Sequence, residues 1–186
     1  MPFADPVQAV QYLGFDGPMT LADFGAGTGA YSLLLARRLN LGKVYAIEIQ
    51  PEVLGRLAAE AREQSLDNIE VIWGDVEKMG GSQLADGAVD GVLISNLLSQ
   101  AKALYTLALE AARVLRPGGR VVIIDWQDSF GGLGPHPSEV VTALAAEQIF
   151  GGAGFRPTGE FSPGAHHWGR YFRKGAWRPA TFKLSF

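Results

Sequence analysis

Short apolar runs alternate with longer amphipathic stretches along the chain. The short runs are rich in Val, Ile, Leu and Phe and stop at Gly, Asn, Asp or Pro, which is typical of buried strands. They predict five strands followed by two closing strands, at about 20–24, 43–47, 69–73, 89–94, 121–124, 158–161 and 167–173. Between them, apolar residues three and four positions apart predict helices at about 5–13, 30–39, 51–61, 99–111 and 138–150. The regular alternation of strands and helices favours an α/β fold with a parallel sheet.

Capping residues set the expected starts of two of these helices. Asp5 followed by a proline is typical of an N-cap and a first helical residue, and this start places Val7, Val10 and Leu13 on the buried side. Ser99 is the expected N-cap of the fourth helix. Both helices are therefore expected to begin with a side chain that accepts a backbone hydrogen bond.

Three glycines at alternate positions, Gly25, Gly27 and Gly29, follow the first predicted strand, and a helical pattern begins directly after them. Such a turn leaves no side chain between a ligand and the N–H groups at the start of the helix. With Ala30 as the last small residue, the spacing also fits the dinucleotide fingerprint G-x-G-x-x-G/A. Asp23 separates the two interpretations, because a carboxylate there favours a ligand with a cationic amine over one with a phosphate.

Two motifs resemble those of the class I, Rossmann-like S-adenosylmethionine-dependent methyltransferases. The first is the acidic-x-G-x-G-x-G strand end at 23–29, and the second is the Leu-Arg-Pro-Gly-Gly turn at 115–119. The resemblance covers about 13–174 and implies a single domain over 1–186, with 175–186 as a C-terminal extension. It also implies an α/β fold with a doubly wound, mostly parallel seven-stranded sheet, helices on both faces and a C-terminal antiparallel hairpin.

The resemblance implies S-adenosyl-L-methionine as the cofactor and gives roles to residues at two strand ends. Glu48 is the expected partner of the ribose hydroxyls, with a capping or surface carboxylate as the alternative. Ile49 is expected to pack on the adenine. Asp75 is expected to bind the adenine amino group beside the backbone N–H of Val76, with a simple turn residue as the alternative. The predicted cofactor-binding residues are Asp23, Gly25, Ala26, Gly27, Gly29, Glu48, Ile49, Asp75, Val76, Ser95 and Asn96.

The acceptor is expected near the ends of the fourth and fifth strands, because ligands in open parallel sheets lie beyond the carboxyl ends of the strands. Residues 96–99 read Asn-Leu-Leu-Ser where families that methylate amino groups often carry Asn/Asp-Pro-Pro-Tyr, which disfavours that acceptor class. The glycine-rich loop 125–137 is the candidate lid, and disorder without a function is the alternative. Catalytic residues stay unassigned, with His136, Asn96 and Asp125 as the candidates.

His166 and His167 stand side by side at the start of the last predicted strand, where neighbouring side chains point to opposite faces. Adjacent histidines in a strand are therefore poor ligands for one metal ion. The chain contains no cysteine, which removes thiolate metal sites, disulfides and a cysteine nucleophile. No metal site is predicted.

The formal net charge of −3 is unevenly distributed along the chain. From Phe155 onward there are six Lys or Arg residues and one Glu. This basic end leaves RNA open as a partner, and a solvated strand edge protected by charges is the plainer alternative. No apolar run approaches the roughly 20 residues of a membrane span. The N-terminus lacks the features of a signal peptide, so a cytoplasmic location without membrane contact is expected, and a homodimer is left open.

These features together predict an S-adenosylmethionine-dependent methyltransferase. The sulfonium already activates its methyl group, so transfer is an in-line displacement that mainly requires alignment of the acceptor. A small-molecule acceptor is favoured, because no recognisable RNA-binding module accompanies the domain. Arsenite is disfavoured, because its methylation depends on thiolates that the chain lacks. The alternatives are a non-catalytic protein that binds S-adenosylmethionine, an NAD(P)-binding oxidoreductase, and an enzyme that transfers an aminopropyl group from a related sulfonium.

Overall fold

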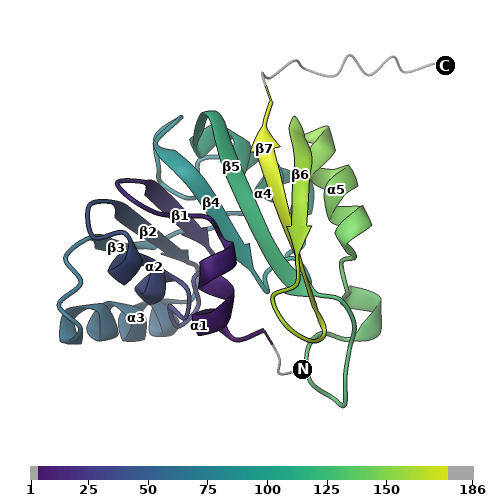
Figure 1. Cartoon of the computed structure of the whole chain (residues 1–186), viewed down its shortest axis with the longest axis horizontal. Coiled ribbons are helices and arrows are strands. Elements are labelled where there is room, and N and C mark those ends of the chain that lie inside the picture. Colours follow the sequence, from purple (N-terminus) through teal and green to yellow (C-terminus); the bar gives the residue numbers. More distant parts are fainter. Residues whose placement is uncertain (1–3, 176–186) are drawn as a thin grey trace.

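A seven-stranded sheet forms the centre of the molecule in a computed structural model, which describes residues 4–175 (Figure 1). The strand order is β3-β2-β1-β4-β5-β7-β6. The strands are β1 Thr20–Phe24, β2 Lys43–Glu48, β3 Ile69–Trp73, β4 Val89–Ser95, β5 Leu115–Trp126, β6 Phe155–Phe161 and β7 His167–Lys174. Every strand predicted from the sequence is present, and β1 and β3 have the predicted bounds.

The first five strands run parallel, and β7 is inserted antiparallel between β5 and β6. The predicted doubly wound, mostly parallel sheet with a C-terminal antiparallel hairpin is therefore confirmed. The strand order reverses between β1 and β4, which is where open parallel sheets bind ligands. Because β7 runs backward, its first residue lies at the carboxyl edge of the parallel strands and its last residue lies at the amino edge.

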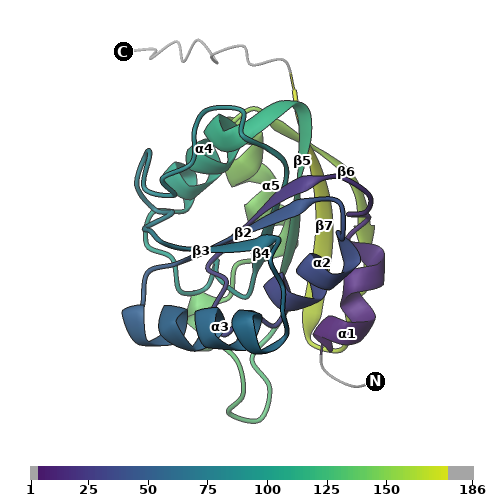
Figure 2. The same ribbon diagram turned by 90° about the vertical axis from the view of Figure 1, so that its left-hand side faces the viewer.

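Helices cover both faces of the sheet, as predicted (Figure 2). Leu13, Leu35 and Val122 belong to the apolar core on the face of α1 and α2, and Phe24, Leu107 and Phe150 belong to the core on the face of α4 and α5. A smaller cluster packs Leu57 of α3 against Ala46. The helices are α1 Pro6–Ala9, α2 Ser32–Arg38, α3 Pro51–Glu63, α4 Leu104–Val114 and α5 Ala143–Gly152, with short 3-10 turns at Val10–Tyr12 and Pro137–Glu139.

Three details of the predicted helices are wrong. Val7 is 66% exposed, because the turn from Pro6 to Tyr12 buries Ala9 in its place, while Leu13 is buried as predicted. The helix placed at Ser99 starts at Leu104, and the N–H groups of the two residues before it, Lys102 and Ala103, donate to a side chain from another loop. The last helix starts after Thr142, whose hydroxyl accepts from Ala145, whereas Ser138 lies in a separate 3-10 turn.

The loop after β5 and the end of β7 lie at opposite ends of the sheet, at the bottom and the top of Figure 1. The positions of Arg156, Arg173 and Lys174 at the start of β6 and the end of β7 therefore put these cations at the amino edge. The C-terminal extension predicted at 175–186 lies outside the described residues from 176 onward. No helix in the described range is long and apolar enough to cross a membrane.

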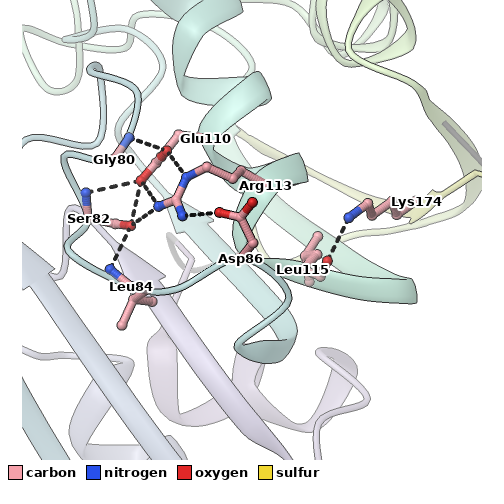
Figure 3. Close-up of polar contacts among 8 residues, drawn as sticks. All are labelled: Gly80, Ser82, Leu84, Asp86, Glu110, Arg113, Leu115 and Lys174. Carbon is pink, nitrogen blue, oxygen red and sulfur yellow. Dashed lines mark hydrogen bonds and ion pairs between the residues drawn. The ribbon is translucent and has the colours of Figure 1, made fainter. Parts of the chain in front are cut away.

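The buried carboxylate of Glu110 joins α4 to the loop between β3 and β4 (Figure 3). The carboxylate of Glu110, which has no exposed surface, accepts from Arg113 at 2.7 and 2.8 Å. It also accepts from the Gly80 N–H and from the N–H and hydroxyl of Ser82. Burial alone would raise the pKa of Glu110, but these bonds outweigh it and lower the pKa to about 2. Asp86 binds the far side of the same guanidinium.

Candidate functional site

Two adjoining hollows lie at the carboxyl edge of the sheet, where the strand order reverses. The larger, about 460 Å³, lies over the ends of β1, β2 and β3, and the smaller, about 250 Å³, lies over the ends of β1 and β4. Both are lined by Gly25, Gly27, Thr28, Asn96 and Gln100. The shared residues make the two hollows parts of one elongated site.

Most of the predicted cofactor-binding residues line this site. Asp23 and Gly29 do not, because Asp23 is buried at the end of β1 and Gly29 packs against Leu57 of α3. The site is also lined by three residues that were not among the predicted cofactor-binding residues, Thr28, Gln50 and Gln100. No sequence motif identifies these three positions. The predicted residues that do line it are Gly25, Ala26, Gly27, Glu48, Ile49, Asp75, Val76, Ser95 and Asn96.

The glycine turn takes a backbone conformation that side chains disfavour. Gly25, Gly27 and Gly29 have φ angles of 72°, 55° and 87°. A Cβ on Gly29 would meet the Leu57 side chain at 2.1 Å, so this glycine permits close packing of α3. A Cβ on Gly27 would meet nothing within 4 Å, so this glycine leaves the backbone open toward the hollows.

Glu48 ties the glycine turn to the end of β2. One carboxylate oxygen accepts from the Gly27 N–H at 3.0 Å, and the other accepts from the N–H groups of Ile49 and Gln50, each at 2.9 Å. Since each carboxylate oxygen can accept two hydrogen bonds, the oxygen facing Gly27 retains one free position. Glu48 thus combines the capping role that the sequence left as an alternative with room for one further donor.

Asp23 is a buried carboxylate with an unmet hydrogen-bonding position. It is 1% exposed, and one oxygen accepts from the Ser32 hydroxyl at 2.5 Å. The other oxygen is buried and has no partner in the described structure. Burial raises the pKa of Asp23 to about 6, against the Ser32 bond, and the nearby Glu48 raises it further. A cationic group or an added donor beside this oxygen would relieve the cost of burial.

Asp75 and Glu77 shape the wall beyond β3. Asp75 accepts from the Glu77 N–H at 3.1 Å and pairs with Lys78 at 3.0 Å, so it makes the turn contacts expected of the alternative interpretation while lining the hollow. Glu77 accepts from the N–H groups of Lys102 and Ala103 and caps α4. The sequence could not identify this cap, because the contact joins residues 25 and 26 positions apart.

Asn96 and Asp125, two of the catalytic candidates, lie on either side of the β4 exit. Asn96 has a φ of 49°, a conformation that asparagine tolerates better than most residues, and its side-chain oxygen is buried without a partner in the described range. Asp125 is fully buried under this loop and accepts from the Leu98 and Trp126 N–H groups, each at 2.8 Å. Burial raises the pKa of Asp125 to about 6, although these bonds oppose the shift. Asp125 holds the loop and lines neither hollow.

The three histidines have different surroundings. His136 is exposed and caps the turn at Pro137, with Nδ1 2.7 Å from the Ser138 hydroxyl. His166 precedes β7 with a φ of 63°, so the alternation expected for a strand does not apply to it, and its Nδ1 lies 2.6 Å from Asp128. His167 is 5% exposed, and its ring centre lies 4.2 Å from that of Trp126. Across residues 4–175, no group of three or more His, Asp or Glu side chains is placed to hold a metal ion.

Comparisons with known proteins agree with this geometry. A family model described as a methyltransferase domain matches residues 22–123. A crystal structure of an S-adenosylmethionine-dependent methyltransferase from Aquifex aeolicus superposes with a TM-score of 0.83 and 28% identity, covering 92% of this chain and 90% of that one.

Two curated relatives match only part of this chain and a smaller part of their own length. An arsenite methyltransferase of Halobacterium salinarum is 29% identical over 107 residues, which cover 57% of this chain. A malonyl-[acyl-carrier protein] O-methyltransferase of Methylococcus capsulatus is 34% identical over 113 residues, which cover 60% of this chain. The matched stretches span 27% and 38% of these two relatives, so the similarity concerns one part of each.

Proposed function

This chain belongs to the class I S-adenosylmethionine-dependent methyltransferase family, and from that premise we propose that it transfers a methyl group from S-adenosylmethionine to a small-molecule acceptor. The observation that carries the proposal is the elongated site beside the glycine turn, which Asn96 lines. Asp23 does not line it but precedes the lining residue Gly25 by two positions in the chain. Each of these two side chains has a buried oxygen with no partner among residues 4–175. Unsatisfied buried acceptors are costly, so a ligand with donors or positive charge fits this position. We also propose that 1–186 acts as one domain.

The residues present fit the cofactor. S-adenosylmethionine supplies an activated methyl group on a sulfonium, together with an ammonium, ribose hydroxyls and an adenine. Glu48 would accept from a ribose hydroxyl through its remaining position, and Asp75 would accept from the adenine amino group beside Val76. Asp23 would lower the energy of the ammonium through its buried charge. Gly27 would leave room for the ligand against the backbone, whereas a Cβ on Gly25 would meet the Leu97 side chain at 3.0 Å.

The placement of charge supports a small acceptor over RNA. Arg156, Arg173 and Lys174 make up much of the basic end that left RNA open, and they lie at the amino edge of the sheet. A polyanion bound there would face away from the glycine turn. Of the other three cations of that end, Arg170 is paired with Glu147 and Glu160, and Arg178 and Lys183 lie outside the described residues.

The acceptors named for the two curated relatives do not transfer to this chain. Arsenic(III) is a soft centre that thiolates bind, and this chain has no cysteine. A malonyl carboxylate is an anion, and it needs a cation or several donors near the methyl group. Neither hollow of the elongated site is lined by Lys or Arg.

Isothermal titration with S-adenosylmethionine, S-adenosylhomocysteine and NADH tests the cofactor. We expect micromolar binding of the two sulfur nucleotides and none of NADH. Glu48→Ala and Asp75→Ala should each weaken binding about tenfold, the loss of roughly one hydrogen bond to a charged group. Glu70→Ala is the matched control, because Glu70 is an exposed carboxylate on β3 that pairs with Lys43.

Unchanged affinity in both Glu48→Ala and Asp75→Ala would contradict the assigned cofactor contacts. Binding of NADH alone would contradict the proposal as a whole. Binding of S-adenosylmethionine with no methylation of any acceptor would leave a non-catalytic binding protein.

A further inference from the structure

A hollow of about 320 Å³ lies at the amino edge of the sheet, at the opposite end from the elongated site. It is lined by Met19 before β1, Asp90 of β4, the turn 116–119, and Arg120 and Arg173 of β5 and β7. The five residues of β1 span the two edges, roughly 16 Å at 3.3 Å per residue. This arginine hollow shares no lining residue with the elongated site.

Three arginines form a row across three strands beside this hollow. Arg120 of β5 lies opposite Arg173 of β7, and Arg173 lies opposite Arg156 of β6. Residues directly opposite each other on antiparallel strands share a face of the sheet, with their Cβ atoms about 4.5–5.5 Å apart. Like charges in such pairs are destabilising. The row is therefore a cost to the ligand-free protein that a bound anion would reduce.

The row has no carboxylate partner. A fourth arginine at the hollow, Arg116, pairs with Asp90 at 2.6 Å. Within residues 4–175, no member of the row forms an ion pair. Burial lowers the pKa of Arg120, and Asp16 opposes this shift without pairing with it. Residues 176–186 contain no Asp or Glu that could supply the missing charge.

Neutral groups hold the two arginines of the row that line the hollow. The guanidinium carbon of Arg120 lies 4.9 Å from the centre of the Phe15 ring, and its Nη2 donates to the Gly14 carbonyl. The Nε of Arg120 is buried and has no partner in the described structure. Arg173 makes one long bond, 3.4 Å, to the Gly118 carbonyl. Buried donors without a partner are costly, so an acceptor is missing beside Arg120 as well as a charge.

The charge left over in the hollow matches a phosphate monoester. Arg120 and Arg173 bring two positive charges, whereas Arg116 and Asp90 neutralise each other. A phosphate monoester carries about −1.5 to −2 charges at pH 7. The planar guanidinium also fits the oxygens of a phosphate better than an ammonium does. A monocarboxylate would neutralise only half of this charge.

The row is short for an RNA strand, whose phosphodiesters carry one charge each. Lys174 follows Arg173 on β7, so its side chain points to the other face of the sheet, where it donates to the Leu115 carbonyl. The row thus offers three cations on its face, whereas proteins that hold nucleic acid through its backbone contact about 6–10 phosphates. The hollow accommodates one phosphoryl group with a small substituent, since its volume is at the lower end of small-molecule sites, roughly 300–1,000 Å³.

We propose that the arginine hollow binds a small phosphate monoester as a dianion, at a site separate from that of the cofactor. The phosphoryl oxygens accept from Arg120 and Arg173, and their charge reduces the repulsion within the row. Arg156, which does not line the hollow, acts on the ligand through its charge alone. The inference goes beyond the proposed function and does not rest on it.

Isothermal titration at about 0.15 M salt tests the site with three probes. They are glycerol 3-phosphate, glycerate as the matched monocarboxylate, and a short single-stranded RNA without terminal phosphates. The variant is Arg173→Gln, because Arg173 is exposed and its replacement leaves the packing of Arg120 on Phe15 intact. Arg56→Gln is the matched control, since Arg56 is an exposed arginine of α3 that does not line the hollow.

We expect glycerol 3-phosphate to bind with a submillimolar Kd and glycerate to bind at least about tenfold more weakly. Arg173→Gln should weaken the binding of glycerol 3-phosphate about tenfold, the loss of roughly one hydrogen bond to a charged group, and Arg56→Gln should leave it unchanged. Saturating S-adenosylmethionine should not alter this affinity, because the two sites lie at opposite edges.

Thermal unfolding gives a second readout. Glycerol 3-phosphate at ten times its Kd should raise the Tm of the wild type and of Arg56→Gln by about 3 °C, and that of Arg173→Gln much less at the same concentration. Without ligand, Arg173→Gln should have a Tm equal to or above that of the wild type, because one of the opposed charges is gone.

Four results would overturn the inference. They are equal affinity of Arg173→Gln and the wild type, a ligand-free Arg173→Gln that is less stable, RNA binding without phosphate monoester binding, and competition between glycerol 3-phosphate and S-adenosylmethionine. The last result would locate the phosphate at the glycine turn. Failure of S-adenosylmethionine to bind would contradict the proposed function and leave the arginine hollow untouched.

Discussion

Two buried carboxylates on opposite faces of the sheet show how differently burial can be compensated. Glu110 accepts from the backbone and side chain of Ser82, from Gly80 and from Arg113. Asp23 accepts from the Ser32 hydroxyl alone and keeps one oxygen without a described partner. The pKa of Glu110 is lowered to about 2, whereas that of Asp23 is raised to about 6.

The difference separates a carboxylate that holds the fold from one to which we assign a ligand-binding role. A buried charge whose hydrogen bonds are all made holds the groups that bond to it in place. Removal of one partner leaves the remaining charge buried without compensation, which destabilises the fold. A buried charge with an unmet position destabilises the ligand-free protein. That cost is offset when a cation or donor arrives, which is the behaviour expected beside a cofactor.

The largest effect should follow from Glu110→Gln, which keeps the shape and removes the charge. Arg113 would lose its buried partner, and breaking a buried ion pair by removing one partner costs about 3–5 kcal/mol. Urea denaturation should show this loss in the free energy of unfolding. A change below about 1 kcal/mol would mean that Asp86 alone satisfies the guanidinium.

The pH dependence of stability should have two limbs of opposite slope. The pKa of Glu110 is lowered from 4.5 in the unfolded chain to about 2 in the folded protein. Its contribution to the free energy of unfolding, about 3 kcal/mol, is therefore complete above pH 4.5 and is lost as the pH falls toward about 2. A raised pKa works the other way, so Asp23 and Asp125 each favour the folded state at low pH and lose that contribution as the pH rises from 3.8 through about 6.

Denaturation curves measured across this range check the two limbs in the ligand-free protein. Glu110→Gln should flatten the acid limb, and Asp23→Asn should reduce the slope of the other limb by about half, because Asp125 still titrates there. If Asp23→Asn leaves the pH dependence of the free energy of unfolding between pH 3.8 and about 6 unchanged, the pKa of Asp23 is not raised by burial as described.

The smallest change in stability should come from Asp23→Asn at neutral pH. The asparagine oxygen can still accept from Ser32, and relief of the buried charge is opposed by a buried amide without a partner. The free energy of unfolding should stay within about 1 kcal/mol of the wild type, while titration should show affinity for S-adenosylmethionine at least about tenfold weaker. The reverse pattern, with lost stability and kept affinity, would remove the distinction between the two carboxylates.

Elements that depend on nearby residues could be predicted from the sequence. The strands were found because apolar runs and the turn residues that end them are adjacent in the chain, and β1 and β3 have the predicted bounds. The glycine turn and the strand ends bring Glu48, Asp75 and Asn96 to one site, as the two motifs implied. Their roles toward a cofactor stay predictions.

Features that depend on distant contacts could not be predicted. The start of α4 is set by Glu77, which lies in another loop, so the local signal at Ser99 led to a wrong boundary. His136 is a catalytic candidate because it lies in a loop, and in the structure it is exposed. His167 lines a hollow because its strand, β7, runs antiparallel beside β5. No pattern within either segment shows which residues the sheet brings together.

The three backbone hydrogen bonds made by Glu48 have a consequence for binding. The N–H groups of Gly27, Ile49 and Gln50 already donate to one carboxylate before any ligand binds. The arriving molecule does not have to order this turn, so binding carries no cost for ordering it.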